Sequence, residues 1–409
     1  MAAALATEPA THSRGGLRRV LGTLCVTETT SWGILYYAFP VLAGRISADT
    51  GWSLTRLTAA FSLGLVVSAV VGVGVGRWLD RKGPRWLMTA GSVLAAISLV
   101  GVALAPSYGW FVAAWAVAGT AMSAVLYPPA FAALTRWYGD RRVHALTVLT
   151  LAAGLASTIF APITAGLAGR LSWRDTYLVL AVLLAMVTVP GHLLGLRLAW
   201  PPPPPSSVPA SSAPRQVVRS RAFLTLVVAF GLTSCTAYVV VINLVPLLGE
   251  RGFGPGTAAM VLGVGGVGQV LGRLGYAPLA RRLGVRARTA VVLATVAITT
   301  GLLGVLTWLP ALVAVAVLAG MVRGIVTLLQ ATAVPDRWGS RHYGALSGVL
   351  AAPLTLTTAV APFLGAALAA LLGGYATMLV VMAVVGLAAA ALSLGSLPGP
   401  GGAERGIPS

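Results

Sequence analysis

Charged residues are scarce in this 409-residue sequence, and the scarcity identifies the class of protein. Aspartate and glutamate together number 9, lysine and arginine number 28, and all four make up 9% of the chain. A soluble domain carries about 25% charged residues. Hydrophobic residues make up 57% of the chain, and the mean hydropathy is +0.88. These values exclude an ordinary soluble domain and indicate an integral membrane protein in a lipid bilayer.

Cysteine is also rare, and patterns typical of catalysis or metal binding are missing. The two cysteines, Cys25 and Cys235, lie inside apolar runs, which favours small buried residues over a disulfide framework. The sequence contains no nucleophile–base pairing, no metal-ligand cluster and no phosphate loop. Gly263 to Gly268 have the spacing of a dinucleotide fingerprint, but no strand precedes them, which favours close helix packing instead. We therefore expect neither an enzyme nor a cofactor or metal.

The net charge of +19 comes from short arginine clusters that lie between apolar runs. Nucleic-acid binding needs a basic face on a soluble domain, which this distribution does not supply. We therefore do not expect a nucleic-acid partner.

Twelve apolar runs are long enough to cross a membrane, because about 20 helical residues at about 1.5 Å each span about 30 Å of hydrocarbon. The runs show no strand alternation, so α-helix is the expected spanning form. They cover residues 20–44, 56–76, 86–105, 110–134, 143–168, 174–198, 222–248, 257–279, 289–308, 310–335, 343–371 and 374–397.

Lysine and arginine predict the orientation of these helices. Of the 28 cations, 21 fall on the side that holds both termini and five fall on the other side. The remaining two, Arg273 and Arg323, lie within helices. By the positive-inside rule, we expect a multi-pass protein of the cytoplasmic membrane with both termini in the cytoplasm.

A proline-rich segment separates the first six expected helices from the last six. It contains PPPPPSSVPASSAPR, which is typical of an extended, semi-rigid spacer. The predicted organisation is a cytoplasmic tail (1–19), a six-helix bundle (20–198), a cytoplasmic linker (199–221), a second six-helix bundle (222–397) and a cytoplasmic tail (398–409).

The two bundles resemble each other at an offset of 200 residues. Gly139 matches Gly339, and Arg141 matches Arg341. Loop glycines and arginines in register argue for duplication. Transporters built from two parallel six-helix repeats place their substrate between the halves, near the middle of the membrane.

The sequence GRWLDRKGPR (76–85) resembles the signature between helices two and three of the major facilitator superfamily. The signature positions are Gly76, Asp80, Arg81, Gly83 and Arg85. The resemblance covers nearly the whole chain, and it implies an all-α membrane fold of twelve helices in two pseudo-symmetric bundles. It also implies that Asp80 lies against the start of helix eleven, near Tyr343 to Ser347, as part of a cytoplasmic gate.

Further stretches look similar to the monocarboxylate transporter branch and its oxalate and formate exchanger relatives. They are WGILYYAFPV (32–41), GWSLTRLTAAFSL (51–63), RWYGDRRVHAL (136–146), SWRDTYLVLA (172–181) and HYGALSG (342–348). Two positions depart from the animal carriers. Val41 replaces a lysine, and Gln269 replaces the acid that precedes the helix-eight arginine by four residues. That family's arrangement for proton coupling is therefore not reproduced here.

Three ionisable residues inside the expected helices are candidates for the substrate site, because charge within a bilayer is costly and signals function. They are Glu28, Arg273 and Arg323. The resemblance implies that Arg273 anchors a carboxylate, which a guanidinium suits chemically. The alternative is a structural arginine paired with Glu28 or with helix carbonyls. Glu28 is the candidate for proton coupling, as the one acid away from the ends of these runs; Asp175 is only the second residue of its run.

Neutral residues could line the same cavity, with helix packing as the alternative for each. They are Trp32, Tyr36, Tyr37, Tyr127, Asn243, Gln269 and Gln330. His192, near the end of helix six, is expected at the membrane interface.

Together these features predict a monomeric secondary transporter of a small organic anion, with a monocarboxylate as the leading substrate class and protons as a candidate co-substrate. The alternative is a proton-driven exporter of drugs or natural products, whose cavity need not use Arg273. Helix four lacks an internal arginine and helix five keeps only APITAG (161–166), so the antiporter signatures are incomplete.

Overall fold

The computed structural model describes residues 13–202 and 214–397. The tail 398–409, most of the tail 1–19 and the proline-rich centre of the linker lie outside the described residues. The described residues are helical, with no strand among them. The predicted all-α fold is confirmed.

The helices of the first half are α1 (Arg14–Trp32), α2 (Ala38–Thr50), α3 (Leu54–Lys82), α4 (Pro84–Ala103), α5 (Tyr108–Val125), α6 (Tyr127–Tyr138), α7 (Arg142–Gly154), α8 (Ala156–Ala168) and α9 (Trp173–Pro190). Short π or 3-10 turns lie between or after them: η1 (Gly33–Tyr37), η2 (Gly139–Arg141) and η3 (Gly191–Gly195). The linker contributes α10 (Pro214–Arg219). The second half contains α11 (Arg221–Glu250), α12 (Pro255–Arg282), α13 (Val285–Val305), α14 (Leu309–Ala333), α15 (Pro335–Trp338), α16 (Tyr343–Leu372) and α17 (Tyr375–Ser393).

These elements form the twelve predicted membrane helices. There are more elements than membrane helices because several of the membrane helices are interrupted. Helix one is α1, η1 and α2; helix four is α5 and α6; helix five is α7 and α8; helix ten is α14 and α15. By length and composition, eight described stretches could cross a membrane. One of them, Tyr108–Ala168, contains both helix four and helix five.

The junction between helices two and three is shorter than predicted. The sequence 76–85 was expected to form a loop, but α3 continues to Lys82 and α4 begins at Pro84. Arg81 and Lys82 stabilise the carboxyl end of α3 through its dipole, and proline suits the first position of α4. Gly83 alone makes the turn, with a φ of 76° that favours glycine.

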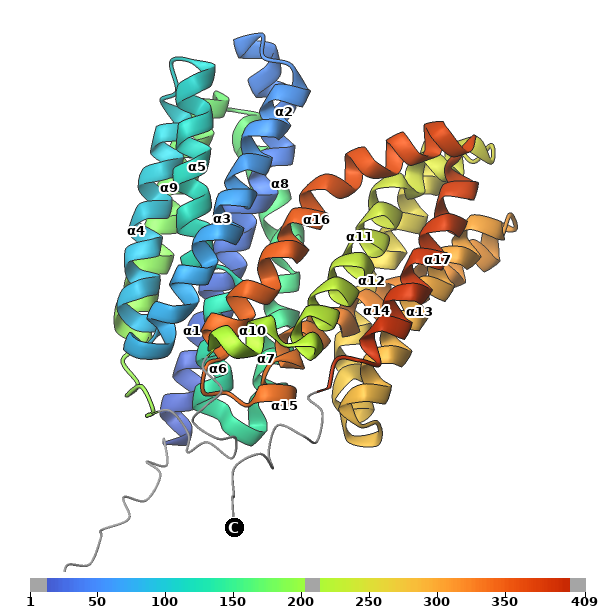
Figure 1. The fold of residues 1–409 in the computed structure, drawn as a ribbon. Coiled ribbons are helices and arrows are strands. Elements are labelled where there is room, and N and C mark those ends of the chain that lie inside the picture. Colours follow the sequence, from blue (N-terminus) through green and yellow to red (C-terminus); the bar gives the residue numbers. More distant parts are fainter. Residues whose placement is uncertain (1–12, 203–213, 398–409) are drawn as a thin grey trace, which may run out of the picture.

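The two halves meet at one end of the molecule and diverge at the other (Figure 1). We call the end that holds Gly83, Trp200 and α15 the linker end, and the opposite end the far end. One apolar cluster contains buried residues of both halves, including Leu134 and Leu146 of the first half and Phe223 and Leu350 of the second. The two other clusters each belong to one half. The shared core therefore lies towards the linker end.

Glycines let α12 and α14 pack closely in the second half. A Cβ on Gly268 would overlap the Val317 carbonyl oxygen, and a Cβ on Gly320 would overlap the Gly265 carbonyl oxygen. These contacts confirm the packing interpretation of the glycine run at 263–268, with two of its members, Gly265 and Gly268, against α14.

Candidate substrate site and inter-half gate

Four of the predicted aromatic residues come together beside the break in helix one. The ring centroids of Trp32 and Tyr36 are 5.3 Å apart, those of Trp32 and Tyr127 are 5.0 Å apart, and those of Tyr36 and Tyr37 are 5.2 Å apart. Tyr36 and Tyr37 belong to η1, a π-helical turn. Such turns occur frequently at functional sites. Gly33 starts this turn and leaves room for the ring of Phe160.

Glu28 lies one helical turn before Trp32 and is fully buried. Neither of its carboxylate oxygens makes a hydrogen bond of good geometry among the described residues, and a nearby donor is the Trp32 indole N–H. Tyr127 and Cys25 lie within electrostatic range of the carboxylate. An ionised carboxylate in such surroundings is costly, which makes Glu28 a candidate proton-binding group.

Arg273 joins the second half to the first. Its side chain is only 5% exposed, and its Nη1 donates a hydrogen bond to the backbone carbonyl oxygen of Thr150 in α7. It forms no ion pair with Glu28 among the described residues. Of the structural alternatives for Arg273, the pairing with a helix carbonyl is therefore the one present. Tyr37 and Tyr127 both lie within electrostatic range of the guanidinium.

Arg323 approaches the same region from α14. It lies within electrostatic range of Tyr238 of α11, and its Nε is buried without a partner among the described residues. Tyr238 also lies within electrostatic range of Tyr36, Tyr37 and Tyr127. Tyr238 was missed from the sequence. The available signal was a tyrosine in the middle of an apolar helix, five residues before the chosen Asn243.

The three amide residues predicted for the site, Asn243, Gln269 and Gln330, make their described contacts with other parts of the second half. Asn243 is 3% exposed, donates from Nδ2 to the Val239 carbonyl oxygen at 2.8 Å and packs against Gly365, which is the helix-packing alternative for this residue. Gln330 donates to the Ser234 hydroxyl at 3.3 Å within the second half. The backbone of Gln269 packs against Gly324 of α14, and its side chain is partly buried.

His192 was expected at the interface, but it is fully buried. Its Nδ1 lies 2.8 Å from the Ser92 hydroxyl oxygen of α4. The π turn η3 places it there, so it belongs to the packing of helices three and six.

Asp80 joins α3 to the start of α16 at the linker end. Its Oδ1 accepts from the Gly344 backbone N–H at 3.0 Å, and its Oδ2 accepts from the Ala345 N–H at 2.9 Å. This is the contact that the resemblance implied. Both N–H groups lie in the first turn of α16, where they have no intrahelical acceptor and where the helix dipole favours a negative charge. His342 precedes the helix and gives no side-chain cap, so Asp80 takes that role from the other half.

Small residues make this approach possible. A Cβ on Gly76 would overlap the Gly344 carbonyl oxygen, and a Cβ on Gly348 would lie 2.8 Å from the Gly72 carbonyl oxygen. Of the other signature residues, Arg85 donates from Nε to the Leu193 carbonyl oxygen at 2.9 Å. Arg81 is exposed. Within the signature, Gly76 thus allows α3 to approach α16 closely, and Asp80 supplies the negative charge that binds the start of α16.

The start of the linker is packed behind Asp80. Arg136 donates to the Asp80 backbone carbonyl oxygen at 3.3 Å and to the Pro201 carbonyl oxygen at 3.1 Å. The Trp200 ring lies under the Arg136 guanidinium, 4.9 Å from ring centroid to Cζ, and also against Gly83. The first residues of the linker, Trp200 and Pro201, are therefore packed against the first half.

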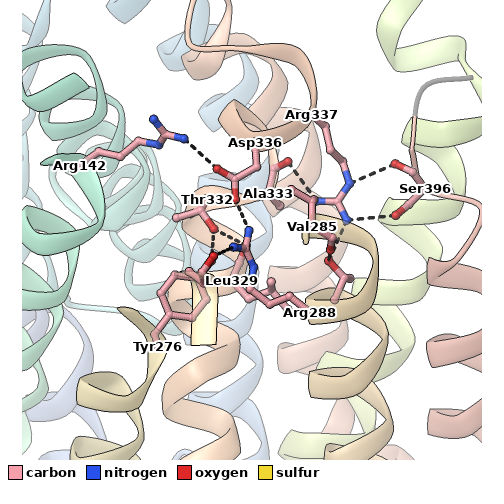
Figure 2. A network of polar contacts seen from close by, with 12 residues as sticks. Arg142, Tyr276, Val285, Arg288, Leu329, Thr332, Ala333, Asp336, Arg337 and Ser396 are labelled. Carbon is pink, nitrogen blue, oxygen red and sulfur yellow. Dashed lines mark hydrogen bonds and ion pairs between the residues drawn. The ribbon is translucent and has the colours of Figure 1, made fainter. Parts of the chain in front are cut away.

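A second charged contact between the halves is centred on Asp336 of α15, as Figure 2 shows. Arg142 of the first half lies 2.8 Å from Oδ1 of Asp336, and Arg288 of the second half pairs with Oδ2. Arg337, the next residue, turns away and donates to Ser396 and Thr289. Asp336 was missed from the sequence. It occupies the repeat position of Arg136, so the two halves use opposite charges at equivalent places.

Burial and the neighbouring Arg341 and Arg136 lower the pKa of His342 below its ordinary value. The neutral form of His342 is therefore favoured near neutral pH. A neutral imidazole adds no positive charge to the end of α16 that Asp80 contacts.

Comparison with known proteins identifies the family. The family model of the Major Facilitator Superfamily matches residues 24–352, so the chain belongs to this superfamily of membrane transporters. Monocarboxylate transporter 11 of Homo sapiens is 28% identical over 315 residues, which cover 69% of this chain and 62% of that protein. The fujikurins efflux protein of Gibberella fujikuroi is 30% identical over 125 residues, covering 31% of this chain and 25% of that protein. The matches span less than two thirds of either relative.

Solved structures agree on the fold. The E. coli fucose:proton symporter FucP superposes with a TM-score of 0.72 at 12% identity, covering 92% of this chain and 98% of that chain. A second structure of FucP, in the outward conformation, gives a TM-score of 0.73. The protein is therefore a multi-pass membrane transporter with the twelve-helix fold of the superfamily.

We predict that Asp80→Asn weakens the conformation closed at the linker end. An amide keeps one acceptor oxygen and loses the charge, so about 1–2 kcal/mol of stabilisation is removed. Maleimide labelling of Ser347→Cys, whose hydroxyl position on α16 is buried in this structure, should become about 5–30-fold faster. The control is Asp140→Asn, which changes an exposed acid at the same end. Equal labelling rates in the two variants would show that the contact of Asp80 with α16 does not stabilise the closed linker end.

Proposed function

We propose that this transporter moves a small organic anion, a monocarboxylate, across the cytoplasmic membrane by alternating access. The observation that carries the proposal is Arg273, a buried guanidinium that contacts the first half at Thr150 and lies within electrostatic range of Tyr37 and Tyr127. A guanidinium can bind a carboxylate through two parallel hydrogen bonds. The similarity to a protein named monocarboxylate transporter 11 supports this substrate class.

The proposed cycle has two end states. In the present conformation the linker end is closed by Asp80, Asp336 and Arg273, while the halves diverge at the far end. The distribution of cations supports a cytoplasmic linker end. The present conformation would then be open to the outside, in keeping with its likeness to FucP in the outward conformation.

Protons are the proposed co-substrate, and Glu28 is the proposed carrier. It is fully buried, with no cation paired to it among the described residues, one turn from the Trp32 indole and within electrostatic range of Tyr127. Binding a proton there removes a costly charge from the apolar interior. Because the proton and the anion carry opposite charges, their joint movement is electrically neutral.

The second candidate is export of a natural product or drug. It is favoured by the partial similarity to the fujikurins efflux protein and by the group of aromatic rings in contact with one another. Trp32, Tyr36, Tyr37, Tyr127 and Tyr238 offer several flat apolar surfaces, which suit a larger substrate.

Uptake measurements separate the two candidates. Proteoliposomes should accumulate at least one of labelled acetate, lactate and pyruvate, faster with an inward proton gradient, whereas accumulation of the dicarboxylate oxalate alone would contradict the monocarboxylate class. Arg273→Ala should lower the transport efficiency about 10–100-fold, because a hydrogen bond to a charged group contributes about 1.5–3 kcal/mol. Arg281→Ala, an exposed arginine on the same helix, should transport normally. The absence of uptake of all four acids, or normal uptake by Arg273→Ala, would contradict the proposal.

Glu28→Gln should separate proton coupling from substrate exchange. Glutamine has the shape of glutamate but cannot exchange a proton, so gradient-driven accumulation should be lost while counterflow of the labelled acid continues. Asp140→Asn again serves as the control. A variant that retains full gradient-driven accumulation would show that Glu28 is not the carrier.

A further inference from the structure

We propose that Arg273 also holds the two halves together, as the polar contact between them that lies farthest inside from the linker end. A substrate carboxylate opens the linker end by binding the guanidinium in place of the Thr150 carbonyl oxygen. This second role rests on the proposed function, since it concerns the same arginine. In this role the Arg273 side chain binds in a space that Gly154 and the Thr150 carbonyl oxygen form, which we call the docking place.

The docking place lies at the break in helix five. The α7 segment ends at Gly154, the Leu155 N–H turns back to the Ala152 carbonyl oxygen at 3.0 Å, and α8 starts at Ala156. Thr150 stands one turn before Gly154, and its carbonyl oxygen accepts from Nη1 of Arg273. A carbonyl oxygen has two lone pairs, so it can accept this bond in addition to a helical one.

Gly154 makes the docking possible. A Cβ at this position would overlap Nη1 of Arg273. The position is helical and its φ is not positive, so the backbone itself does not require glycine. Gly166, in the following helix α8, has nothing within 4 Å of the place of its Cβ. The three heavy atoms nearest to a Cβ at Gly154 all belong to the Arg273 guanidinium, so a side chain here would displace the guanidinium and not the backbone of helix five.

The bond to Thr150 leaves Arg273 incompletely satisfied. Its Nε is buried and has no hydrogen-bond partner among the described residues. A buried donor without an acceptor is costly. A carboxylate can take two donors at once and forms bonds about twice as strong as a neutral acceptor does. The substrate therefore competes favourably with the neutral carbonyl for the same guanidinium.

The position of the contact links this competition to opening. Thr150 lies eight residues beyond Arg142, which is about 12 Å along a helix from the ion pair with Asp336. Loss of the Arg273 contact leaves the contacts at Asp80 and Asp336, which lie nearer the linker end. A ligand that binds better when Arg273 is undocked shifts the population towards opening at the linker end.

The test compares Gly154→Ala with Gly166→Ala in purified protein in lipid nanodiscs, with Cys25 and Cys235 replaced and Ser347→Cys as the probe. Without ligand, Gly154→Ala should be labelled by a polar maleimide about tenfold faster than Gly166→Ala, because a bond to a charged donor is lost. Lactate should accelerate labelling of Gly166→Ala and should have little further effect on Gly154→Ala.

Arg273→Gln provides a second variant in case Gly154→Ala does not fold. It shortens the side chain and should also raise labelling without ligand. Equal ligand-free labelling of both variants and Gly166→Ala would overturn the gating role, even if Arg273→Ala abolishes uptake. Faster ligand-free labelling in a protein that takes up none of the four acids would instead retain the gate and reject the proposed substrate.

Discussion

The carboxylate of Asp80 at the start of α16 is the interaction on which this conformation depends. It satisfies two N–H groups that the helix itself leaves without acceptors, and it meets the positive end of the helix dipole. The contact requires α3 and α16 to approach at glycines, which brings apolar residues of both halves into one core. Arg136 and Trp200 hold the backbone around Asp80 from behind, so the start of the linker takes part in the same structure.

The polar contacts between the halves lie at successive depths, and each has a different chemistry. Asp80 binds backbone N–H groups, Asp336 binds Arg142, and Arg273 binds a backbone carbonyl farther inside. The outer contacts pair opposite charges or a charge with a helix dipole. The innermost contact sets a charge against a neutral acceptor, so it is the one that an anion can replace. In the proposed cycle, the substrate acts at this innermost contact.

The run lengths were sufficient to predict twelve helices, because a bilayer fixes the length of an apolar helix. The signature residues likewise located the contact of Asp80 with α16. The interruptions at η1 and after Gly154 could not be predicted in the same way, since they depend on neighbours such as Phe160 and Arg273 that are distant in sequence. For the same reason the bond of Asn243 to its own helix could not be predicted: an amide that bonds to its own helix has the same sequence signal as one that faces a substrate. Tyr238 and Asp336 gained their significance only from partners on other helices.

The central claim is that the halves exchange a closed linker end for a closed far end when substrate binds. Spin-label distances measure this directly on exposed positions, with one pair at Lys82 and Ala287 near the linker end and another at Arg170 and Leu371 near the far end. Addition of a transported monocarboxylate should lengthen the first distance and shorten the second in the same sample. If both distances stay unchanged, or if both change in the same direction, the account of alternating closure is contradicted.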